Sequence, residues 1–109
     1  MSVQHVELAA GRWAQMSFME QMANVGSEVG RALNWRAKNN ADYSQRSFDR
    51  ALELLDLTLG CATSFPRLKE VARTREALVD FFDTNSFGSS EAVLKKYFLH
   101  FAYAVRKDR

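Results

Sequence analysis

The chain has 109 residues, of which 47% are hydrophobic, and its formal net charge is +2. This length supports one domain with its own core, and so small a charge gives no argument for a nucleic-acid or anionic-membrane partner. No apolar run reaches membrane-spanning length, and the single cysteine, Cys61, cannot form a disulfide within the chain, which fits a reducing cytoplasm. One proline and no convincing alternation of apolar and polar residues predict an all-α domain over residues 1–109. Together with the single cysteine and the lack of a membrane-spanning run, this leads us to expect a cytoplasmic protein.

The first long helix is predicted over residues 17–38. Ser17 followed by Glu20 forms a capping box, which marks its start. Residues 1–16 form either an extra short helix or a segment that lies across the bundle. The apolar stripe of the long helix, at a helical spacing, consists of Phe18, Met22, Val25, Val29 and Leu33.

Two glycines, Gly26 and Gly30, lie one turn apart on the flank of this stripe. Each costs a helix up to about 1 kcal/mol relative to alanine, so the pair indicates a place where another backbone or a ligand comes close. Close helix packing is the simpler of these two explanations. Trp35 lies on the polar face of the same helix and must be covered by the N-terminal segment or by another chain.

The second helix is predicted over residues 42–59. Asn39 and Asn40 indicate a helix stop, Asp42 is a good N-cap, and Gly60 follows the end. Its main apolar stripe is Phe48, Ala51, Leu52, Leu55 and Leu59. Three further apolar side chains project from the other side, and they are Tyr43, Leu54 and Leu57.

The third helix is predicted over residues 66–83, with Pro66 in its first turn. Its apolar stripe is Leu68, Val71, Ala72, Leu78, Val79 and Phe82, whereas Phe81 points off it. Arg75 falls in the middle of this stripe. Residue counting along antiparallel helices places Arg75 level with three carboxylates, Glu28, Asp49 and Glu53. We therefore expect an ion pair of Arg75 with one of them, within or between chains, or else a site for an anion such as phosphate.

The fourth helix is predicted over residues 90–106, after an N-cap at Ser89 or Ser90. Its core face is Leu94, Tyr97, Phe98, Phe101 and Val105. Leu99 and Tyr103 face outward, so this helix also has two apolar sides.

No residue pattern identifies a catalytic or metal site. Asp83 to Gly88 imitates the start of an EF-hand loop but has Phe87 at position five and Leu94 at position twelve, so a polar turn is the better interpretation. Two histidines and one cysteine, widely spaced, do not form a zinc pattern. We predict no metal and no cofactor.

One catalytic comparison concerns Lys95 and His100 on the fourth helix. Their spacing weakly resembles the arginine and histidine motif of the HEPN ribonucleases, which are also small helical bundles. Lysine lacks the planar fork of arginine that suits a phosphate. An RNA- or nucleotide-directed bundle, either a degenerate ribonuclease or the helical partner of a nucleotidyltransferase, is therefore kept as the alternative function.

Most of the chain resembles a family of small helical proteins from bacteria and archaea. The resemblance rests on the blocks NVGSEVGRALNW at 24–35, RALELLDLTL at 50–59, RLKE at 67–70 and YFLHFAYAVR at 97–106. It implies a compact helical bundle and no chemistry, because we know of no activity that the family would lend.

The apolar side chains that lie off the four core stripes decide the functional prediction. A small monomer seldom leaves so much apolar surface in water. We expect an antiparallel four-helix bundle that forms a homo-oligomer, with a dimer as the first expectation, and that acts by binding protein without catalysis. The predicted interface residues are Gly26, Gly30, Trp35, Tyr43, Leu54, Leu57, Phe81, Leu99 and Tyr103.

Overall fold

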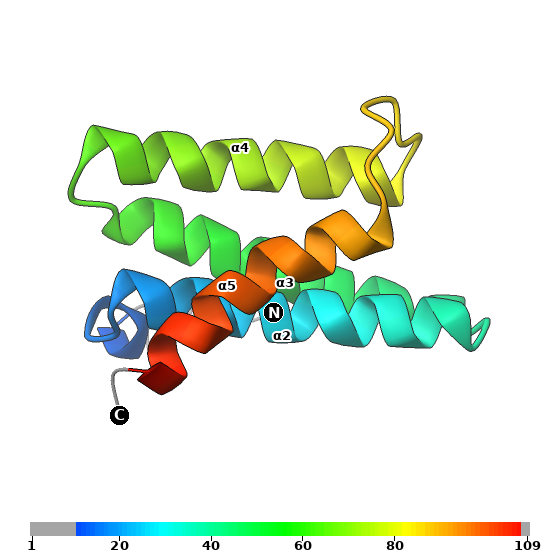
Figure 1. Cartoon of the computed structure of the whole chain (residues 1–109), viewed down its shortest axis with the longest axis horizontal. Helices are drawn as coiled ribbons and strands as arrows, with labels where there is room; N and C mark the ends of the chain where they lie inside the picture. The colour runs from blue at the N-terminus through cyan, green and yellow to red at the C-terminus, as the bar shows by residue number, and fades with distance from the viewer. Residues whose placement is uncertain (1–10, 108–109) are drawn as a thin grey trace.

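A computed structural model describes residues 11–107, and every regular element in this range is a helix (Figure 1). The four long helices are α2 (Phe18–Ala37), α3 (Ala41–Cys61), α4 (Phe65–Phe82) and α5 (Glu91–Lys107). The all-α prediction is confirmed. None of these helices combines the length and the apolarity that crossing a bilayer requires.

Successive helices run in opposite directions, and α5 crosses α2 obliquely (Figure 1). The closest packing joins α2 to α3 and α2 to α5, whereas α4 makes close backbone contact mainly with α3. As a result α4 stands away from α5 along part of its length. This arrangement decides where the surface is hollowed.

The start of α2 follows from its capping box. The Ser17 Oγ accepts a hydrogen bond from the Glu20 amide at 3.1 Å, and the Glu20 carboxylate accepts one from the Ser17 amide at 3.1 Å. At the other end Asn39 has a φ of 60°, and the Asn40 amide donates to the Trp35 carbonyl at 2.9 Å. A left-handed residue followed by such a bond is a common helix ending. Both predicted ends of this helix are confirmed.

The ends of α3 differ from the prediction. The N-cap is Asn40, whose side chain accepts from the Tyr43 amide, and Asp42 lies in the first turn. The helix continues through Gly60 to Cys61 because no residue near Gly60 adopts the left-handed conformation that would end it.

The starts of α4 and α5 each lie within one residue of the prediction. Ser64 caps α4 through the Arg67 amide, with Pro66 in the first turn, and the Ser90 Oγ accepts from the Val93 amide at the start of α5. Residues 11–14 are helical. The prediction for residues 1–10 lies outside the described residues.

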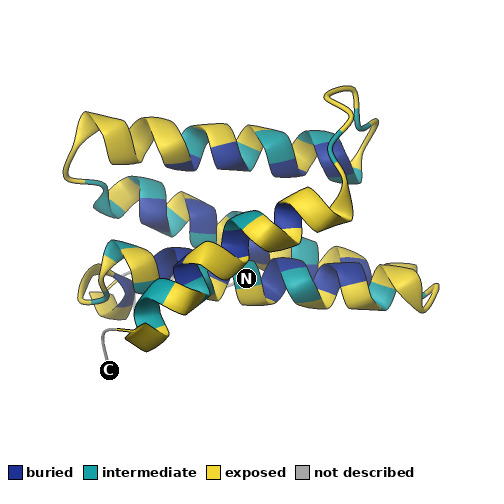
Figure 2. Cartoon of the chain, in the orientation of Figure 1, coloured by how far each residue is buried: buried dark blue, intermediate teal, exposed yellow. Residues whose placement is uncertain are grey.

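The core lies where the four helices face one another (Figure 2). Its apolar members are Met22, Val25, Val29 and Leu33 from α2, Ala51 and Leu55 from α3, Val71, Leu78 and Phe81 from α4, and Leu94, Phe98 and Phe101 from α5. On α3 the small residues Ser44 and Ser47 are also buried, and the Ser44 hydroxyl donates to the Ala32 carbonyl of α2 at 2.8 Å. Small side chains there let the backbones of α2 and α3 approach closely.

Trp13 covers one end of this core. Its side chain is buried, its indole Nε1 donates to the Thr58 hydroxyl at 2.9 Å, and its carbonyl accepts from the Gln21 side chain at 2.9 Å. The segment before α2 is thereby tied to both α2 and α3 by buried hydrogen bonds, each worth roughly 1 kcal/mol net.

The apolar face of α4 is rotated from the predicted one. Leu68 and Val79 are exposed, whereas Thr74 and Phe81 are buried. The buried positions Val71, Thr74, Leu78 and Phe81 follow a narrow helical stripe, because the close backbone contacts of α4 are mainly with α3. Phe81 as an interface residue is therefore a correction, since its own chain covers it.

Candidate functional site

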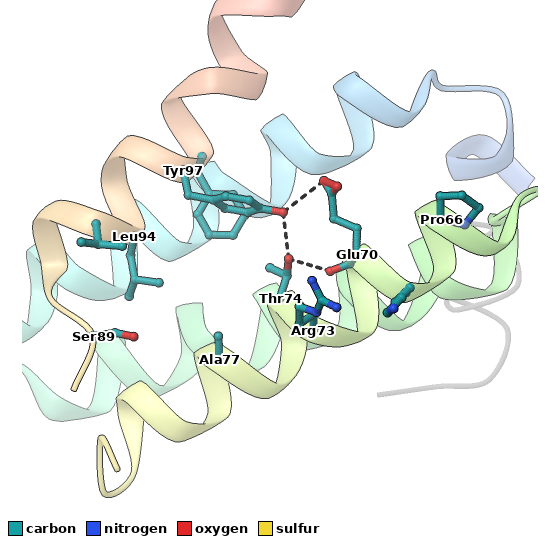
Figure 3. A pocket seen from close by; sticks show the side chains of 11 residues that line it. Pro66, Glu70, Arg73, Thr74, Ala77, Ser89, Leu94 and Tyr97 are labelled. Carbon is teal, nitrogen blue, oxygen red and sulfur yellow. Dashed lines mark hydrogen bonds between the residues drawn. The ribbon is translucent and has the colours of Figure 1, made fainter. Parts of the chain in front are cut away.

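An open cleft lies between α4 and α5 (Figure 3). It offers about 540 Å³ to water-sized molecules, which lies in the range of small-molecule sites. We call it the α4/α5 cleft. Its lining residues are Pro66, Lys69, Glu70, Arg73, Thr74, Ala77, Ser89, Val93, Leu94, Tyr97 and Phe98.

A hydrogen-bonded group spans this cleft from α5 to α4 (Figure 3). The Tyr97 hydroxyl lies 2.9 Å from the Thr74 hydroxyl and donates to Glu70 Oε1 at 3.3 Å. The Thr74 hydroxyl also donates to the Glu70 carbonyl one turn earlier, at 2.9 Å. In the described part of the chain, these contacts of Tyr97 are the hydrogen bonds that join α4 to α5.

Tyr97 is held in its neutral form. The pKa of its phenol is raised to about 12, mainly by burial; the hydrogen bond with Thr74 lowers it in part, and the negative charge of Glu70 and the hydrogen bond to that carboxylate contribute to raising it. At neutral pH Tyr97 is therefore a hydrogen-bond donor and not a base. Its ring also packs against Phe98 and Phe101, with ring centroids 5.0 and 5.3 Å away.

Two cations, Lys69 and Arg73, lie one turn apart on the α4 side of the cleft. Neither makes an ion pair with a residue of the described range 11–107. Glu70, the carboxylate beside them, accepts the hydrogen bond of Tyr97. The cleft thus combines apolar lining residues with two cations that form no ion pair in the described range, and with one carboxylate beside them.

Arg75 lies away from the α4/α5 cleft and pairs with Asp56 of α3. Its Nε donates to Asp56 Oδ1 at 2.8 Å and its Nη2 to Oδ2 at 3.5 Å, while 37% of its side chain stays exposed. The predicted partners Glu28, Asp49 and Glu53 are corrected. The rotation of α4 moves Arg75 to the edge of the buried stripe, opposite the exposed face of α3. Because its guanidinium is engaged by a carboxylate, the anion site predicted around it finds no support.

The three carboxylates predicted for Arg75 have other surroundings. Glu28 is buried and accepts from Arg31 at 2.6 Å, with Arg50 3.9 Å from its second oxygen. Asp49 accepts from the Gln45 side chain. Glu53 is exposed on α3. The structure does not bring these groups together.

The two glycines of α2 have different surroundings. A Cβ on Gly26 would lie 2.7 Å from the Phe98 Cβ, so α5 packs directly on bare backbone there. A Cβ on Gly30 would meet nothing within 4 Å. Gly26 therefore serves packing within the chain, as the simpler explanation predicted, and it also lies at the edge of the hollow next to Gly30.

Gly30 opens onto a second, smaller hollow between α2 and α5, of about 210 Å³. We call it the α2/α5 groove. Leu99, 58% exposed, lines its α5 side, and Tyr103, 64% exposed, follows one turn later. The full lining is Ala23, Gly26, Ser27, Val29, Gly30, Leu33, Lys95, Phe98, Leu99 and Ala102.

The other predicted interface residues are partly covered by their own chain. Trp35 is half-buried against Tyr43, with ring centroids 4.9 Å apart, and the Lys38 Nζ lies 5.2 Å from the Trp35 ring. Tyr43 itself is exposed. Leu54 and Leu57 are half-buried, and Leu54 packs against the core.

Lys95 and His100, the residues of the nucleic-acid alternative, are both exposed on α5. Lys95 lines the α2/α5 groove, whereas the His100 ring lies 6.0 Å from that of Phe101. No hydrogen bond involves either side chain in residues 11–107.

The turn between α4 and α5 uses its own oxygen atoms for hydrogen bonds. The Asp80 carboxylate accepts from the amides of Ser86 and Phe87, and Asn85 Oδ1 accepts from the Ser89 amide. Asn85 and Gly88 have positive φ values, which fits a polar turn. Over residues 11–107 no group of three or more His, Cys, Asp or Glu side chains is placed to hold a metal ion.

The cleft residues Glu70, Arg73, Thr74 and Tyr97 were not predicted as a site. Tyr97 was assigned to the core face of its helix. The available signal was the polar trio Glu70, Arg73 and Thr74 at spacings of three and four, which places them together on one face of α4. That spacing does not reveal that α5 stands off from this face.

A scan against protein-family models, a search of curated proteins and a search of solved structures each found no match to this chain. The functional argument therefore rests on the two hollows.

Proposed function

We propose that this chain is a non-enzymatic homo-oligomer that acts by binding protein surfaces. The observation that carries the proposal is the α2/α5 groove, where the exposed Leu99 and the bare backbone of Gly30 line the same hollow, with the exposed Tyr103 one turn after Leu99 on α5. Large apolar side chains next to a hollow are typical of protein interfaces.

A two-fold dimer would cover this apolar surface. Leu99 of each copy would pack into the groove beside Gly30 of the other, so that each contact occurs twice. Burying a leucine fully contributes roughly 1.5–3 kcal/mol. Gly30 supports this arrangement because a side chain there would fill the place that the partner's leucine takes.

The proposal includes the architecture and the cellular location. We infer that α2 to α5 form an antiparallel four-helix bundle that is opened between α4 and α5, with the helical turn at 11–14 as an addition at one end. Support for a cytoplasmic location comes from Cys61, which is a free and only partly exposed thiol.

Size-exclusion chromatography with light scattering tests the oligomer. At micromolar concentration we expect a dimer or larger for the wild type and a monomer for Leu99→Lys. Val79→Lys is the matched control, because it places the same side chain on an exposed apolar position of α4, away from both hollows. A wild type of monomer mass overturns the proposal.

RNA cleavage tests the alternative function. A HEPN-like activity would require Lys95 and His100 to act together on RNA, as the sequence comparison suggested. We expect purified protein to leave RNA intact. Cleavage by the wild type that His100→Ala abolishes would replace the binding proposal with a ribonuclease.

A further inference from the structure

The α4/α5 cleft has two chemically different ends (Figure 3). Ala77, Leu94 and Ser89 lie together at the end next to the α4–α5 turn, while Pro66, Glu70 and Arg73 lie toward the other end, with Tyr97 between the two groups. From Pro66 to Ala77 the α4 wall is roughly 16 Å long at the rise of an α-helix. An elongated ligand with one apolar end and one polar end would match this division.

At the apolar end of the cleft, the protein's own side chains leave apolar surface uncovered. Val93, with 60% of its surface exposed, lines the cleft together with the nearly buried Leu94, its neighbour in sequence, and Phe98. A large β-branched apolar side chain left this open beside a cavity gains from contact with apolar ligand atoms. An alkyl chain is the simplest group that meets this need.

The polar end favours a negative charge. Lys69 and Arg73 are four residues apart, and like charges at this spacing repel each other on a helix. No carboxylate among residues 11–107 forms an ion pair with either of them, although Glu70 lies between them in sequence; its carboxylate accepts the hydrogen bond of Tyr97. The three groups carry a net charge of about +1, which one carboxylate neutralises. A doubly charged phosphate would leave an excess beside Glu70.

We propose that the α4/α5 cleft binds a single-chain amphiphile with a carboxylate head. The alkyl chain lies on Val93, Leu94 and Ala77, and the carboxylate is bound by Arg73 with support from Lys69. The planar fork of a guanidinium suits the two oxygen atoms of a carboxylate. This site is separate from the α2/α5 groove, so it does not depend on the proposed oligomer.

The test uses sodium dodecanoate below its micelle concentration, with titration followed by calorimetry and by amide NMR shifts. We expect saturable binding and shifts concentrated in residues 66–77 and 89–98. Dodecyltrimethylammonium, with the same chain and the opposite charge, should bind at least roughly tenfold more weakly, a ratio that one lost charge-assisted interaction accounts for. Equal binding of the two amphiphiles overturns the assignment of the head.

Charge reversal locates the head group. Arg73→Glu should weaken dodecanoate binding roughly tenfold or more, whereas Lys96→Glu, on an exposed position of α5 outside the cleft, should change it less than about twofold. Circular dichroism confirms that both variants fold. Val93→Asp should abolish dodecanoate binding, because it places a charge where the alkyl chain of the ligand lies. The proposal is overturned if the wild type shows no saturable binding of dodecanoate, or if Arg73→Glu binds it with unchanged affinity. It is also overturned if the cleft binds a peptide helix and does not bind dodecanoate.

The Leu99→Lys variant separates this proposal from the oligomer. It should bind dodecanoate as the wild type does, whatever its mass. If dodecanoate binding is lost together with the oligomer, the amphiphile occupies the interface and the cleft assignment is wrong.

Discussion

The two glycines of α2 allow a direct test of the helix packing. Gly26 and Gly30 lie one turn apart, yet a Cβ at Gly26 would lie 2.7 Å from the Cβ of Phe98 and 3.1 Å from its Cγ and Cδ1, while a Cβ at Gly30 would meet nothing within 4 Å. Alanine at each position therefore adds the same methyl group, once into a closed contact and once into an open groove.

The magnitude follows from two opposing effects. Replacing a helical glycine with alanine stabilises the helix by up to about 1 kcal/mol at either position. At Gly26 the new methyl must also displace Phe98, a buried core residue, and such overpacking typically costs about 1–3 kcal/mol. We expect Gly30→Ala to be about 1 kcal/mol more stable than the wild type. Gly26→Ala should be between equal in stability and about 2 kcal/mol less stable.

The helix-propensity gain cancels between the two variants, so their difference isolates the packing cost. A gap of about 1–3 kcal/mol corresponds to roughly 5–20 °C in Tm for a domain of this size. Circular dichroism with thermal and urea unfolding measures it. The scans are run at a low and a tenfold higher protein concentration, because association makes Tm depend on concentration. Equal stability of the two alanine variants would refute the close approach of α5 to Gly26.

A second substitution checks the mechanism. Phe98→Ala should cost less stability in the Gly26→Ala background than in the wild type, because it removes the Cγ and Cδ1 atoms that would lie 3.1 Å from the new methyl and leaves room for the helices to adjust at Cβ. An identical cost in both backgrounds would show that Gly26 and Phe98 are not coupled.

Three further predictions concern buried and exposed polar contacts. Trp13→Phe should lower the free energy of unfolding by about 1–3 kcal/mol, since it leaves the fully buried Thr58 without this donor; Trp13→Phe in a Thr58→Val background should cost less, and an equal cost would argue against the bond. The phenol of Tyr97 has a pKa of about 12 in the folded chain and near 10 when unfolded, so the folded state holds its proton more tightly and stability falls as pH rises from about 10 to 12. Partial exposure limits this loss of stability to about 1 kcal/mol. Tyr97→Phe should remove it from the pH dependence of urea unfolding. The same variant should lack the tyrosinate absorbance that appears at a higher pH than that of the other tyrosines. Arg75→Ala should cost less than about 1 kcal/mol and become neutral in high salt, because the pair with Asp56 is largely exposed; a loss above 2 kcal/mol would contradict that.

The sequence was a good guide to the local signals that begin and end helices. The capping box at Ser17 and Glu20 and the first-turn Pro66 act through hydrogen bonds and backbone angles within a few residues. For the same reason the helical stop at Asn39 could be anticipated. Where two local signals competed, as between Asn40 and Asp42, the choice was wrong by a turn or less.

The sequence could not specify which part of each apolar surface is buried. Arg75 and Phe81 show this on α4, because a rotation that follows from packing mainly on α3 moved Arg75 to Asp56 and Phe81 into the core. A helical wheel gives the angles between side chains on one helix and contains no information about its neighbours.

The sequence by itself therefore determined an all-α chain, its long helices and most of their ends, since these depend on composition, periodicity and capping within each segment. Only the tertiary structure decided that Gly26 is closed and Gly30 open, and that Tyr97 joins α5 to Thr74 and Glu70 across a cleft. Those features depend on the distances and rotations between helices, which arise from the packing of residues far apart in the chain.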